Sequence, residues 1–188
     1  MHTPPNDPGI WEVLQSSYVF RKPPWLTLRL DHVRLPSGAT IPEYVVLEYP
    51  EWLNIVAVTD DNQIVMVRQY RHGLRRVDWE LPGGVRDAAD PTLEAAARRE
   101  LLEETGFGGG TWQHLMTLSA NPSTNTNLNH SFLARGVIKL REHAQEQTED
   151  IHVHLLPIEQ VREIVLNDGM VQSLNAAPLL KFLVMLGS

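Results

Sequence analysis

The segment LEAAARRELLEETGF, residues 93–107, constrains the fold most strongly, because its apolar face runs directly into glutamate side chains. At about 100° per residue, a helix through this segment brings Ala97, Glu100 and Glu104 within about 60° of one another. A carboxylate at the edge of a core costs several kcal/mol unless it has a strong partner. A hard divalent cation is such a partner, because Mg²⁺ prefers oxygen ligands. The segment therefore predicts a packed helix whose buried side ends in a metal site.

A solvent-exposed helix with surface ion pairs is the alternative for these charges. The pairs Glu94–Arg98 and Arg99–Glu103 each have the four-residue spacing of ion pairs on a helix surface. This alternative accounts for Glu94 and can extend to Glu103. It does not account for Glu100 and Glu104, because both share the apolar side of the helix.

Short apolar segments and turn residues surround this helix and indicate the fold class. PSGAT joins TLRLDHVRL to EYVVLEYP, and DDNQ joins two further apolar runs, so the sequence predicts two hairpins. The segments VDWELPGGV, TWQHLMTLSA, NHSFLARGVI and IHVHLLPI predict strands, and EQVREIVLN and APLLKFLVML predict helices. Because helices alternate with strands, we expect an α/β (α+β) fold with a mixed β-sheet and helices on both faces.

The bounds of the central helix and of the domains follow from local signals. Asp90 and Pro91 are expected to begin the helix, because Asp caps helix N-termini and Pro suits the first turn. Gly106 is expected to end it in a left-handed conformation. We expect residues 1–50 to form an N-terminal arm and β-hairpin region, and residues 51–188 to form the main domain.

Composition excludes several classes of protein and site. The chain of 188 residues has no cysteine, which excludes disulfides, zinc-thiolate sites and a cysteine nucleophile. A net charge of −7 argues against nucleic acid or an anionic membrane as a partner. The N-terminus lacks the apolar run of a signal peptide, and the apolar tail APLLKFLVML is too short to span a bilayer. We therefore expect a cytoplasmic protein.

The run GGVRDAADPTLEAAARRELLEETGF resembles the Nudix box, the loop-helix signature of hydrolases that act on nucleoside diphosphates linked to another group. The match is complete from Arg99 through Phe107. Pro91 stands where the family pattern has its first glutamate, and Asp87 and Asp90 are the candidates for that missing carboxylate. The resemblance implies an α/β/α sandwich that binds Mg²⁺, with Mn²⁺ as an alternative. It implies metal ligands at Glu100, Glu103, Glu104, Glu149 and the Gly83 carbonyl.

The preceding segment, VRQYRHGLRRVDWELPGG, is similar to the one in ADP-ribose pyrophosphatases and related nucleoside-diphosphate-sugar hydrolases. In that subgroup the residues matching Arg71 and Glu80 face the substrate, and Arg68 is a further candidate. A solvated strand end is the alternative for both arginines, but an acidic chain that binds pyrophosphate needs bidentate donors. Pro122 matches a proline of the subgroup, although its loop, NPSTNTN, lacks the usual glycine and glutamate.

The same resemblance implies roles for residues outside the box. The N-terminal hairpin of the subgroup pairs two subunits, and the aromatic residue matching Trp25 stacks on adenine; packing in the core is the alternative for this side chain. Glu149 matches an acidic loop residue that supplies a metal ligand or a base. The catalytic candidates are therefore Glu149, Glu103 and Arg99, which can steady Glu103.

The implied function is Mg²⁺-dependent hydrolysis of the pyrophosphate bond of ADP-ribose or a related nucleoside diphosphate sugar by a homodimer. The products are a nucleoside monophosphate and a sugar phosphate. Hydrolysis of GDP-mannose or another sugar nucleotide is the alternative within the same chemistry. A non-catalytic Nudix module that senses a nucleotide is the alternative from another class.

Overall fold

The computed structural model describes residues 7–142 and 150–187, and within these ranges the chain divides into two compact units. The first unit contains the residues up to Pro50 together with the segment Asn121–Asn127. The second contains Glu51–Ala120 and the residues from Leu128 onward. No sequence signal links residues 121–127 to the first fifty residues, so their place in the first unit is a finding of the structure.

The first unit is built on a three-stranded antiparallel sheet in the order β1-β2-β3. Its strands are β1 (Glu12–Lys22), β2 (Leu26–Arg34) and β3 (Thr40–Glu48). The expected hairpin is β2-β3. The Leu35 amide donates to the Ala39 carbonyl and the Gly38 amide donates to the Leu35 carbonyl, and Gly38 closes the turn at a φ of 87°. The predicted hairpin is confirmed, and β1 adds a third strand that was not predicted. Since nearly all of β1 is exposed, its sequence lacks the apolar alternation that marks a half-buried strand.

The segment 121–127 lies beside the end of β3 in this unit. The Leu47 amide donates to the Thr124 carbonyl at 2.8 Å, and the Thr126 amide donates to the Leu47 carbonyl at 3.0 Å. The Tyr44 hydroxyl donates to the Ser123 carbonyl at 2.5 Å. These bonds attach a polar loop to the N-terminal sheet as a short parallel bridge.

The second unit contains a seven-stranded mixed sheet. Its main path is β12-β5-β4-β10-β9, with β6 beside β5 and β7 beside β4. The pairing of β4 with β10 is parallel, and the other pairings are antiparallel, which confirms the predicted mixed sheet. The strands are β4 (Trp52–Val58), β5 (Gln63–Arg71), β6 (Arg76–Glu80), β7 (Gly83–Val85), β9 (Thr111–Leu118), β10 (Asn129–Arg135) and β12 (Ile151–Pro157); β8 (Phe107–Gly108) pairs with β11 (Ile138–Lys139).

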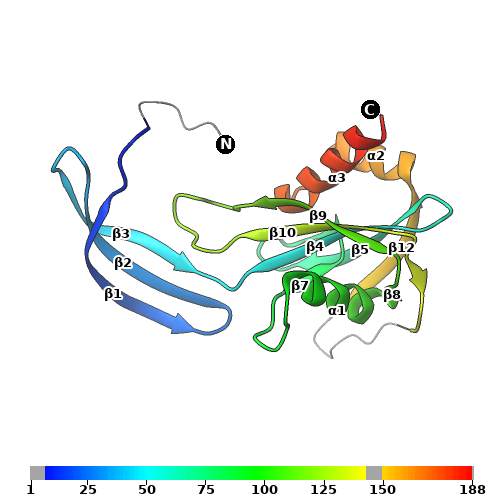
Figure 1. Ribbon diagram of the computed structural model, residues 1–188, viewed down its shortest axis with the longest axis horizontal. Helices are drawn as coiled ribbons and strands as arrows, with labels where there is room; N and C mark the ends of the chain where they lie inside the picture. The colour runs from blue at the N-terminus through cyan, green and yellow to red at the C-terminus, as the bar shows by residue number, and fades with distance from the viewer. Residues whose placement is uncertain (1–6, 143–149, 188) are drawn as a thin grey trace. The chain divides into compact units, whose positions relative to one another are not determined.

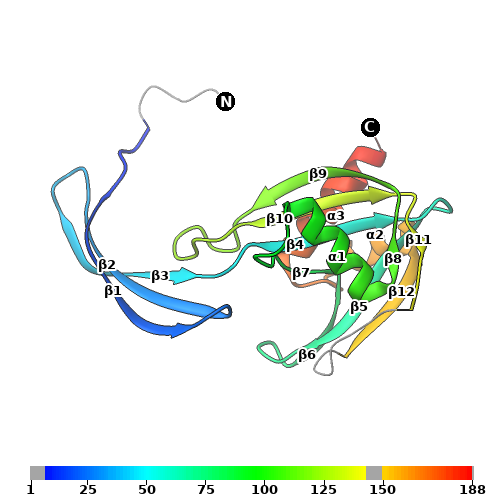
Figure 2. The same cartoon turned by 60° about the horizontal axis from the view of Figure 1, so that its bottom comes forward.

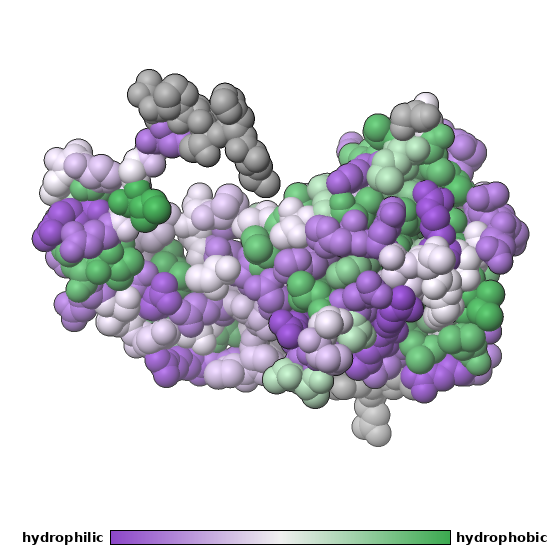
Figure 3. All heavy atoms as spheres, in the orientation of Figure 1, coloured by the Kyte–Doolittle hydropathy of each residue, from purple (hydrophilic) through white to green (hydrophobic). Residues whose placement is uncertain are grey.

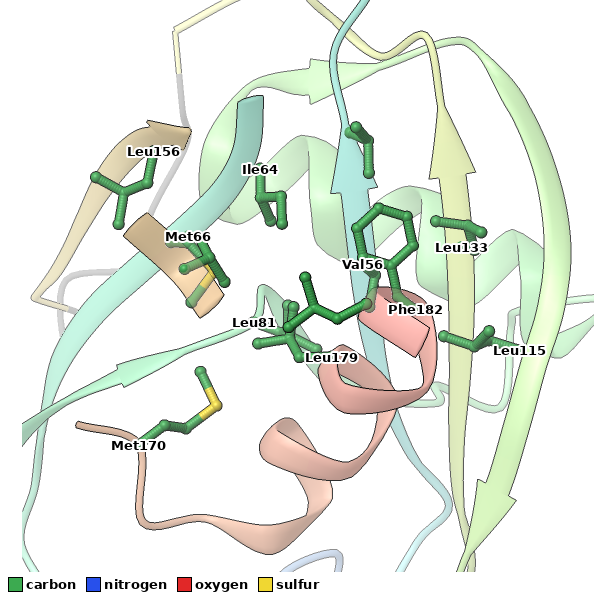
Figure 4. Packing of buried hydrophobic residues seen from close by; sticks show 13 residues of the cluster. Val56, Ile64, Met66, Leu81, Leu115, Leu133, Leu156, Met170, Leu179 and Phe182 are labelled. Atoms are coloured by element: carbon green, nitrogen blue, oxygen red, sulfur yellow. The ribbon is translucent and has the colours of Figure 1, made fainter. Parts of the chain in front are cut away.

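Helices cover both faces of this sheet, as predicted. Figures 1 and 2 show α1 (Leu93–Thr105) against one face, and α2 (Ile158–Leu166) and α3 (Ser173–Leu186) against the other. Strand β4 is buried on both sides, so Ile55 packs in the cluster of α1 and Val56 in the cluster of α3. Figure 4 shows Leu179 and Phe182 of α3 packed toward Val56. The core thus fixes α1 against the middle of the sheet.

Helix α1 begins later than the sequence predicts. Thr92 is the N-cap, because its Oγ1 accepts from the Ala95 amide at 3.0 Å. Asp90 and Pro91 precede the helix, so the prediction that Asp90 caps it was wrong. The Asp90 carboxylate instead accepts from the Asp87 amide at 2.9 Å and turns the loop before the helix. Gly106 ends the helix with a φ of 73°, as predicted.

Exposed apolar side chains gather on the N-terminal sheet. In the view of Figure 3, hydrophobic residues in green stand among hydrophilic ones in purple on this unit. Val13, Tyr18, Val19, Phe20 and Trp25 are all exposed there. Among the residues that the structure describes, no helix is long and apolar enough to cross a membrane.

Candidate active site

The last two turns of α1 are fastened to the Gly-Gly segment of β7 by carboxylates. Glu104 is 7% exposed, and its Oε2 accepts from the Gly83 amide at 2.8 Å. Glu100 is half-buried, and its Oε1 accepts from the Val85 amide at 3.3 Å. Burial raises the pKa of the Glu100 carboxyl above its usual range. The helical phase predicted from the sequence is therefore confirmed, because both glutamates lie on the packed side.

The two glycines of β7 allow this close approach. A Cβ on Gly84 would lie 2.5 Å from the carboxyl carbon of Glu100. A Cβ on Gly83 would lie 2.2 Å from the Leu53 carbonyl oxygen on β4. Any larger residue at position 84 would displace the Glu100 carboxylate, and any larger residue at position 83 would displace strand β4. Both positions therefore need glycine because of these short distances.

Arg99 ties the loop before the helix to the glutamates on it. Its Nη2 lies 2.9 Å from Asp90 Oδ2 and donates to the Val85 carbonyl at 3.1 Å. Its Nη1 lies 2.9 Å from Glu103 Oε2 and 3.0 Å from Glu100 Oε1. The Arg99 guanidinium holds the pKa of Asp90 below its usual range, chiefly through their hydrogen bond. Asp90 thus pairs with Arg99. Asp90 directly precedes Pro91, the residue that stands at the glutamate position of the pattern described above.

The donor set at this place suits a hard divalent cation. Glu100, Glu103 and Glu104 carry carboxylate oxygens, and the backbone of Gly83 contacts Glu104 through its amide. The Glu103 side chain is 43% exposed and lies on the flank, as predicted. In the described part of the chain, no three acidic or histidine side chains are arranged to hold a metal ion by themselves. The carboxylates are turned toward the β7 amides and Arg99, so water and substrate oxygens would have to complete the coordination shell.

Arg71 and Glu80 form a bidentate ion pair near the same loop. Arg71 Nε lies 2.7 Å from Glu80 Oε1, and Arg71 Nη2 lies 2.5 Å from Glu80 Oε2. Glu80 is 2% exposed, whereas the Arg71 side chain is 48% exposed. Gln69 donates a further bond to Glu80 at 3.3 Å. The buried carboxylate therefore fixes a guanidinium that remains partly exposed and lines a cavity.

A cavity of about 320 Å³ lies beside the Arg71–Glu80 pair and is also lined by the β7 segment. Its lining includes amide side chains that were not predicted from the sequence, among them Asn54, which is paired in register with Gly83 of β7. A signal for them exists, since Asn54 interrupts the apolar run WLNIVAV and Asn175 interrupts SLNAAPLL. The lining comprises Trp52, Leu53, Asn54, Arg71, Glu80, Leu81, Gly83, Gly84, Val85, Asn129, Gln172, Leu174 and Asn175.

Of the remaining predicted site residues, only Arg68 can be compared with the cavity directly, because it belongs to the same unit. Arg68 is on the opposite side of the β5–β6 ribbon from Glu80, because it pairs in register with Trp79 and stacks over that ring at 4.9 Å. It does not line the cavity. Trp25, which is 68% exposed, and Pro122 belong to the N-terminal unit. Glu149 lies outside the described residues.

Two family models match the chain. The NUDIX domain matches residues 53–175, and the nucleoside diphosphate sugar hydrolase N-terminal domain matches residues 11–47. The first match covers more than half of the chain and includes α1, β7, Arg71 and Glu80.

Relatives and a solved structure agree with these matches. The chain is 36% identical to the ADP-ribose pyrophosphatase of Mycobacterium tuberculosis (strain ATCC 25618 / H37Rv) over 81% of its length and 74% of the relative's. It is 30% identical to the GDP-mannose pyrophosphatase of Enterobacter sp. (strain 638), over 68% and 70% respectively. A crystal structure of an ADP compounds hydrolase superposes with a TM-score of 0.83 at 20% identity, covering 97% of both chains, which shows the fold. The chain therefore belongs to the Nudix family, as a hydrolase of the group that includes ADP-ribose and nucleoside-diphosphate-sugar pyrophosphatases.

Proposed function

We propose that this Nudix hydrolase cleaves the pyrophosphate bond of ADP-ribose or a related nucleoside diphosphate sugar. Water is the second substrate, and the products are a nucleoside monophosphate and a sugar phosphate. The observation that carries the proposal is the contact of Glu100 and Glu104 with the β7 backbone beside a cavity that also contains Arg71. This arrangement supplies acidic ligands and a phosphate-binding guanidinium at one place.

Magnesium is the proposed cation, with Mn²⁺ as an alternative. Glu100, Glu103, Glu104 and the Gly83 carbonyl would hold it, since these hard oxygen donors suit Mg²⁺. When bound, such an ion neutralises phosphate charge and lowers the pKa of bound water toward neutrality. The Arg99 guanidinium lies against the carboxylates of Asp90, Glu100 and Glu103 and compensates their mutual repulsion.

Arg71 is proposed to hold the diphosphate. Its fork of donors matches two phosphate oxygens, and the Arg71–Glu80 pair fixes the direction of the fork. Hydrogen bonding to Glu80 raises the pKa of Arg71, so the guanidinium stays charged throughout the working range. A cationic group of fixed orientation lowers the cost of binding a diphosphate to a chain of net charge −7.

The remaining roles come from resemblance to the subgroup and are proposed with it. Glu149 serves as general base or further metal ligand, Trp25 stacks on the base, and Pro122 lies beside the substrate. The exposure of Trp25 supports stacking over core packing, because 68% of its surface is available within its own unit. Residues 1–50 are proposed to form the dimerisation region of a homodimer, and residues 51–188 the hydrolase domain.

The test is Mg²⁺-dependent hydrolysis of ADP-ribose by the wild-type chain and by Glu100→Gln. We expect the variant to lose Mg²⁺-dependent turnover and to keep its melting temperature, because a neutral amide ligates Mg²⁺ poorly. Glu94→Gln is the matched control, since Glu94 lies on the same helix and its carboxylate pairs with Arg98. Near-normal turnover by Glu100→Gln would contradict the assignment of Glu100 as a metal ligand.

Hydrolysis of GDP-mannose is the second candidate. The loop NPSTNTN lacks the glycine and glutamate usual in ADP-ribose pyrophosphatases, and a GDP-mannose pyrophosphatase is among the relatives. A panel of ADP-ribose, GDP-mannose and UDP-glucose with product identification separates the candidates. A ratio of kcat/KM that favours GDP-mannose would replace ADP-ribose as the substrate and leave the chemistry unchanged.

A further inference from the structure

Asn54 has an unusual position for an amide. It lies in the middle of the apolar strand β4 and is 4% exposed. Its Nδ2 donates to the Leu174 carbonyl at 2.6 Å, which fixes the orientation of the side chain. Its Oδ1 is buried and has no hydrogen-bond partner within residues 7–142 and 150–187. A buried acceptor without a donor costs about 1–3 kcal/mol, so a ligand or water that supplies the donor is favoured.

Further amides from the start of α3 line the same cavity. Asn175 is 3% exposed, and its Oδ1 accepts from the Leu81 amide at 3.1 Å. Asn175 also donates to Gln172 Oε1, which leaves Gln172 Nε2 without a partner among the described side chains. The wall therefore offers one acceptor, Asn54 Oδ1, and donors from Gln172, and all of these groups are neutral.

The chemistry of this wall selects a class of ligand. A phosphate or carboxylate oxygen would place an acceptor against the Asn54 carbonyl oxygen, which is unfavourable. A hydroxyl group can donate to Asn54 and accept from Gln172 at the same time. The cavity of about 320 Å³ holds more than one water molecule and lies at the small end of ligand pockets, which suits a single sugar ring.

We propose that this amide wall binds the sugar moiety of the substrate, with Asn54 accepting a hydrogen bond from one sugar hydroxyl group. The inference rests on the proposed function, because Arg71, which lines the same cavity, would hold the adjoining phosphate. It makes Asn54 a specificity-determining residue that discriminates between sugars by the presence of one hydroxyl group. A nucleobase whose exocyclic amine donates to Asn54 is the competing occupant.

The experiment compares wild type with Asn54→Leu on the best substrate of the panel and on analogues that each lack one sugar hydroxyl. In the wild type, we expect one analogue to show a kcat/KM lower by about fivefold to tenfold, as for one neutral hydrogen bond. In Asn54→Leu, the parent substrate falls by a similar factor and that analogue falls no further, because the two changes remove the same bond. KM is expected to carry most of the change.

Asn127→Leu is the matched control. Asn127 is also buried, donates to the Pro50 carbonyl at 2.8 Å, and has an Oδ1 without a partner in the described ranges. It does not line the cavity. We expect Asn127→Leu to lower the melting temperature about as much as Asn54→Leu and to leave the ratio between parent and deoxy substrates as in the wild type.

Each other outcome decides the inference. Equal kcat/KM values for all deoxy analogues in the wild type overturn it, even if Asn54→Leu fails to fold. Loss of activity on replacing adenine by hypoxanthine, with no effect of any sugar hydroxyl, assigns the cavity to the base and also overturns it. If the wild type turns over normally and Asn54→Leu lowers kcat/KM by the same factor for the parent substrate and the analogue, the inference fails and the proposed function stands. Absence of turnover on every nucleoside diphosphate sugar removes the proposed function as well.

Discussion

Gly84 lies directly against the Glu100 carboxylate of α1. A Cβ at position 84 would lie 2.5 Å from the Glu100 carboxyl carbon, so even alanine has no room while this carboxylate keeps its place. The Glu100 side chain can rotate, whereas the β7 backbone is held in register with β4. We therefore expect substitution here to act on the carboxylate before it acts on the sheet.

Gly84→Ala is predicted to lower kcat by about 100-fold, the effect expected of a displacement of about 1 Å at a reacting centre. The melting temperature should change little. Gly73→Ala is the control, because a Cβ there meets no atom within 4 Å and the backbone needs no left-handed conformation. Steady-state kinetics and thermal melts measure both variants. A large drop in melting temperature for Gly84→Ala would show that the sheet, rather than the carboxylate, yields.

Asp90 supplies a carboxylate that pairs with Arg99, although Pro91 occupies the position of the first glutamate of the Nudix box. Its pKa is held below the unfolded value of about 3.9 by the hydrogen bond from Arg99. A depressed folded-state pKa stabilises the fold above the unfolded pKa, and this stability is lost as the pH falls through the folded pKa. The contribution of the Asp90–Arg99 pair is therefore complete at neutral pH and absent in strong acid.

Asp90→Asn is predicted to destabilise the chain by about 1 kcal/mol at pH 7, a value reduced for the partial exposure of Arg99. The difference from the wild type should shrink as the pH falls below about 4, because the unfolded wild-type chain then protonates Asp90 while the folded chain protonates it only at lower pH. Denaturant unfolding between pH 3 and 7 measures it. Asp87→Asn is the control, because asparagine can still accept the bond from the Ala89 amide. A difference that stays constant with pH would contradict this account.

The sequence predicts some residues of the site and not others for a physical reason. Helical periodicity places Glu100 and Glu104 on the packed side, because a regular helix converts spacing directly into direction. Their role as metal ligands stays a prediction. Asn54 and Asn175 come together from β4 and α3, and no local pattern records which strand faces which helix end. Such amides can be suspected only from their place in apolar runs.

The β5–β6 hairpin carries two ion pairs of similar form. Arg71 pairs with Glu80, and Arg76 pairs with Asp78 at 3.1 Å; both carboxylates are 2% exposed and both arginines are roughly half exposed. The carboxylates also receive bonds from Gln69 and from the Val171 amide, respectively. Only the first pair lines the cavity. The Arg76–Asp78 pair can therefore serve as a structural control for the Arg71–Glu80 pair, which has a proposed role in substrate binding.

Arg71→Ala and Arg76→Ala are each predicted to cost about 2 kcal/mol, because each leaves a buried carboxylate without its cation at a partly solvated position. Arg71→Ala should in addition raise KM for the nucleoside diphosphate sugar by at least about tenfold, the effect of losing a charge-assisted bond. Thermal melts and KM values separate the two effects. A rise in KM of the same size for Arg76→Ala would refute a special role for Arg71.

At the level of elements, regular strands and helices were predicted where an apolar face or stripe exists. β4, β5, β10, β12 and α1 follow from their buried patterns. β1 was missed as a full strand because it buries almost nothing within its own unit. The start of α1 was misplaced because a carboxylate and a proline before a helix mimic a cap, while the Thr92 hydroxyl makes the bond. Caps depend on geometry that the order of residues leaves open.

At the scale of the whole molecule, the N-terminal unit exposes several apolar side chains. β1 alone presents Val13, Val19 and Phe20 with about half or more of each side chain exposed. Apolar patches of this kind mark interfaces between proteins. The proposed homodimer would cover this surface, because two copies of one sheet can bury the same side chains from both sides.

Val19→Asp combined with Phe20→Asp is predicted to convert a dimer into a monomer, since two charges would be buried at the interface. Light scattering after gel filtration measures the mass. Trp25→Ala is the companion variant: KM should rise about tenfold or more from loss of stacking, with the melting temperature unchanged because Trp25 is exposed. A wild type that is monomeric at micromolar concentration, or a Trp25→Ala protein that unfolds, would contradict these assignments.

The attachment of residues 121–127 to β3 has a consequence for how the chain can be divided. The polypeptide passes between the two units three times: after Pro50, before Asn121 and after Asn127. A single protease cut after Pro50 would leave the N-terminal fragment bound through the bonds of Leu47 and Tyr44 to the 121–127 segment. Removing residues 1–50 would conversely strip that segment of its backbone partners. The two units are therefore interleaved along the chain, and neither can be excised as one continuous stretch.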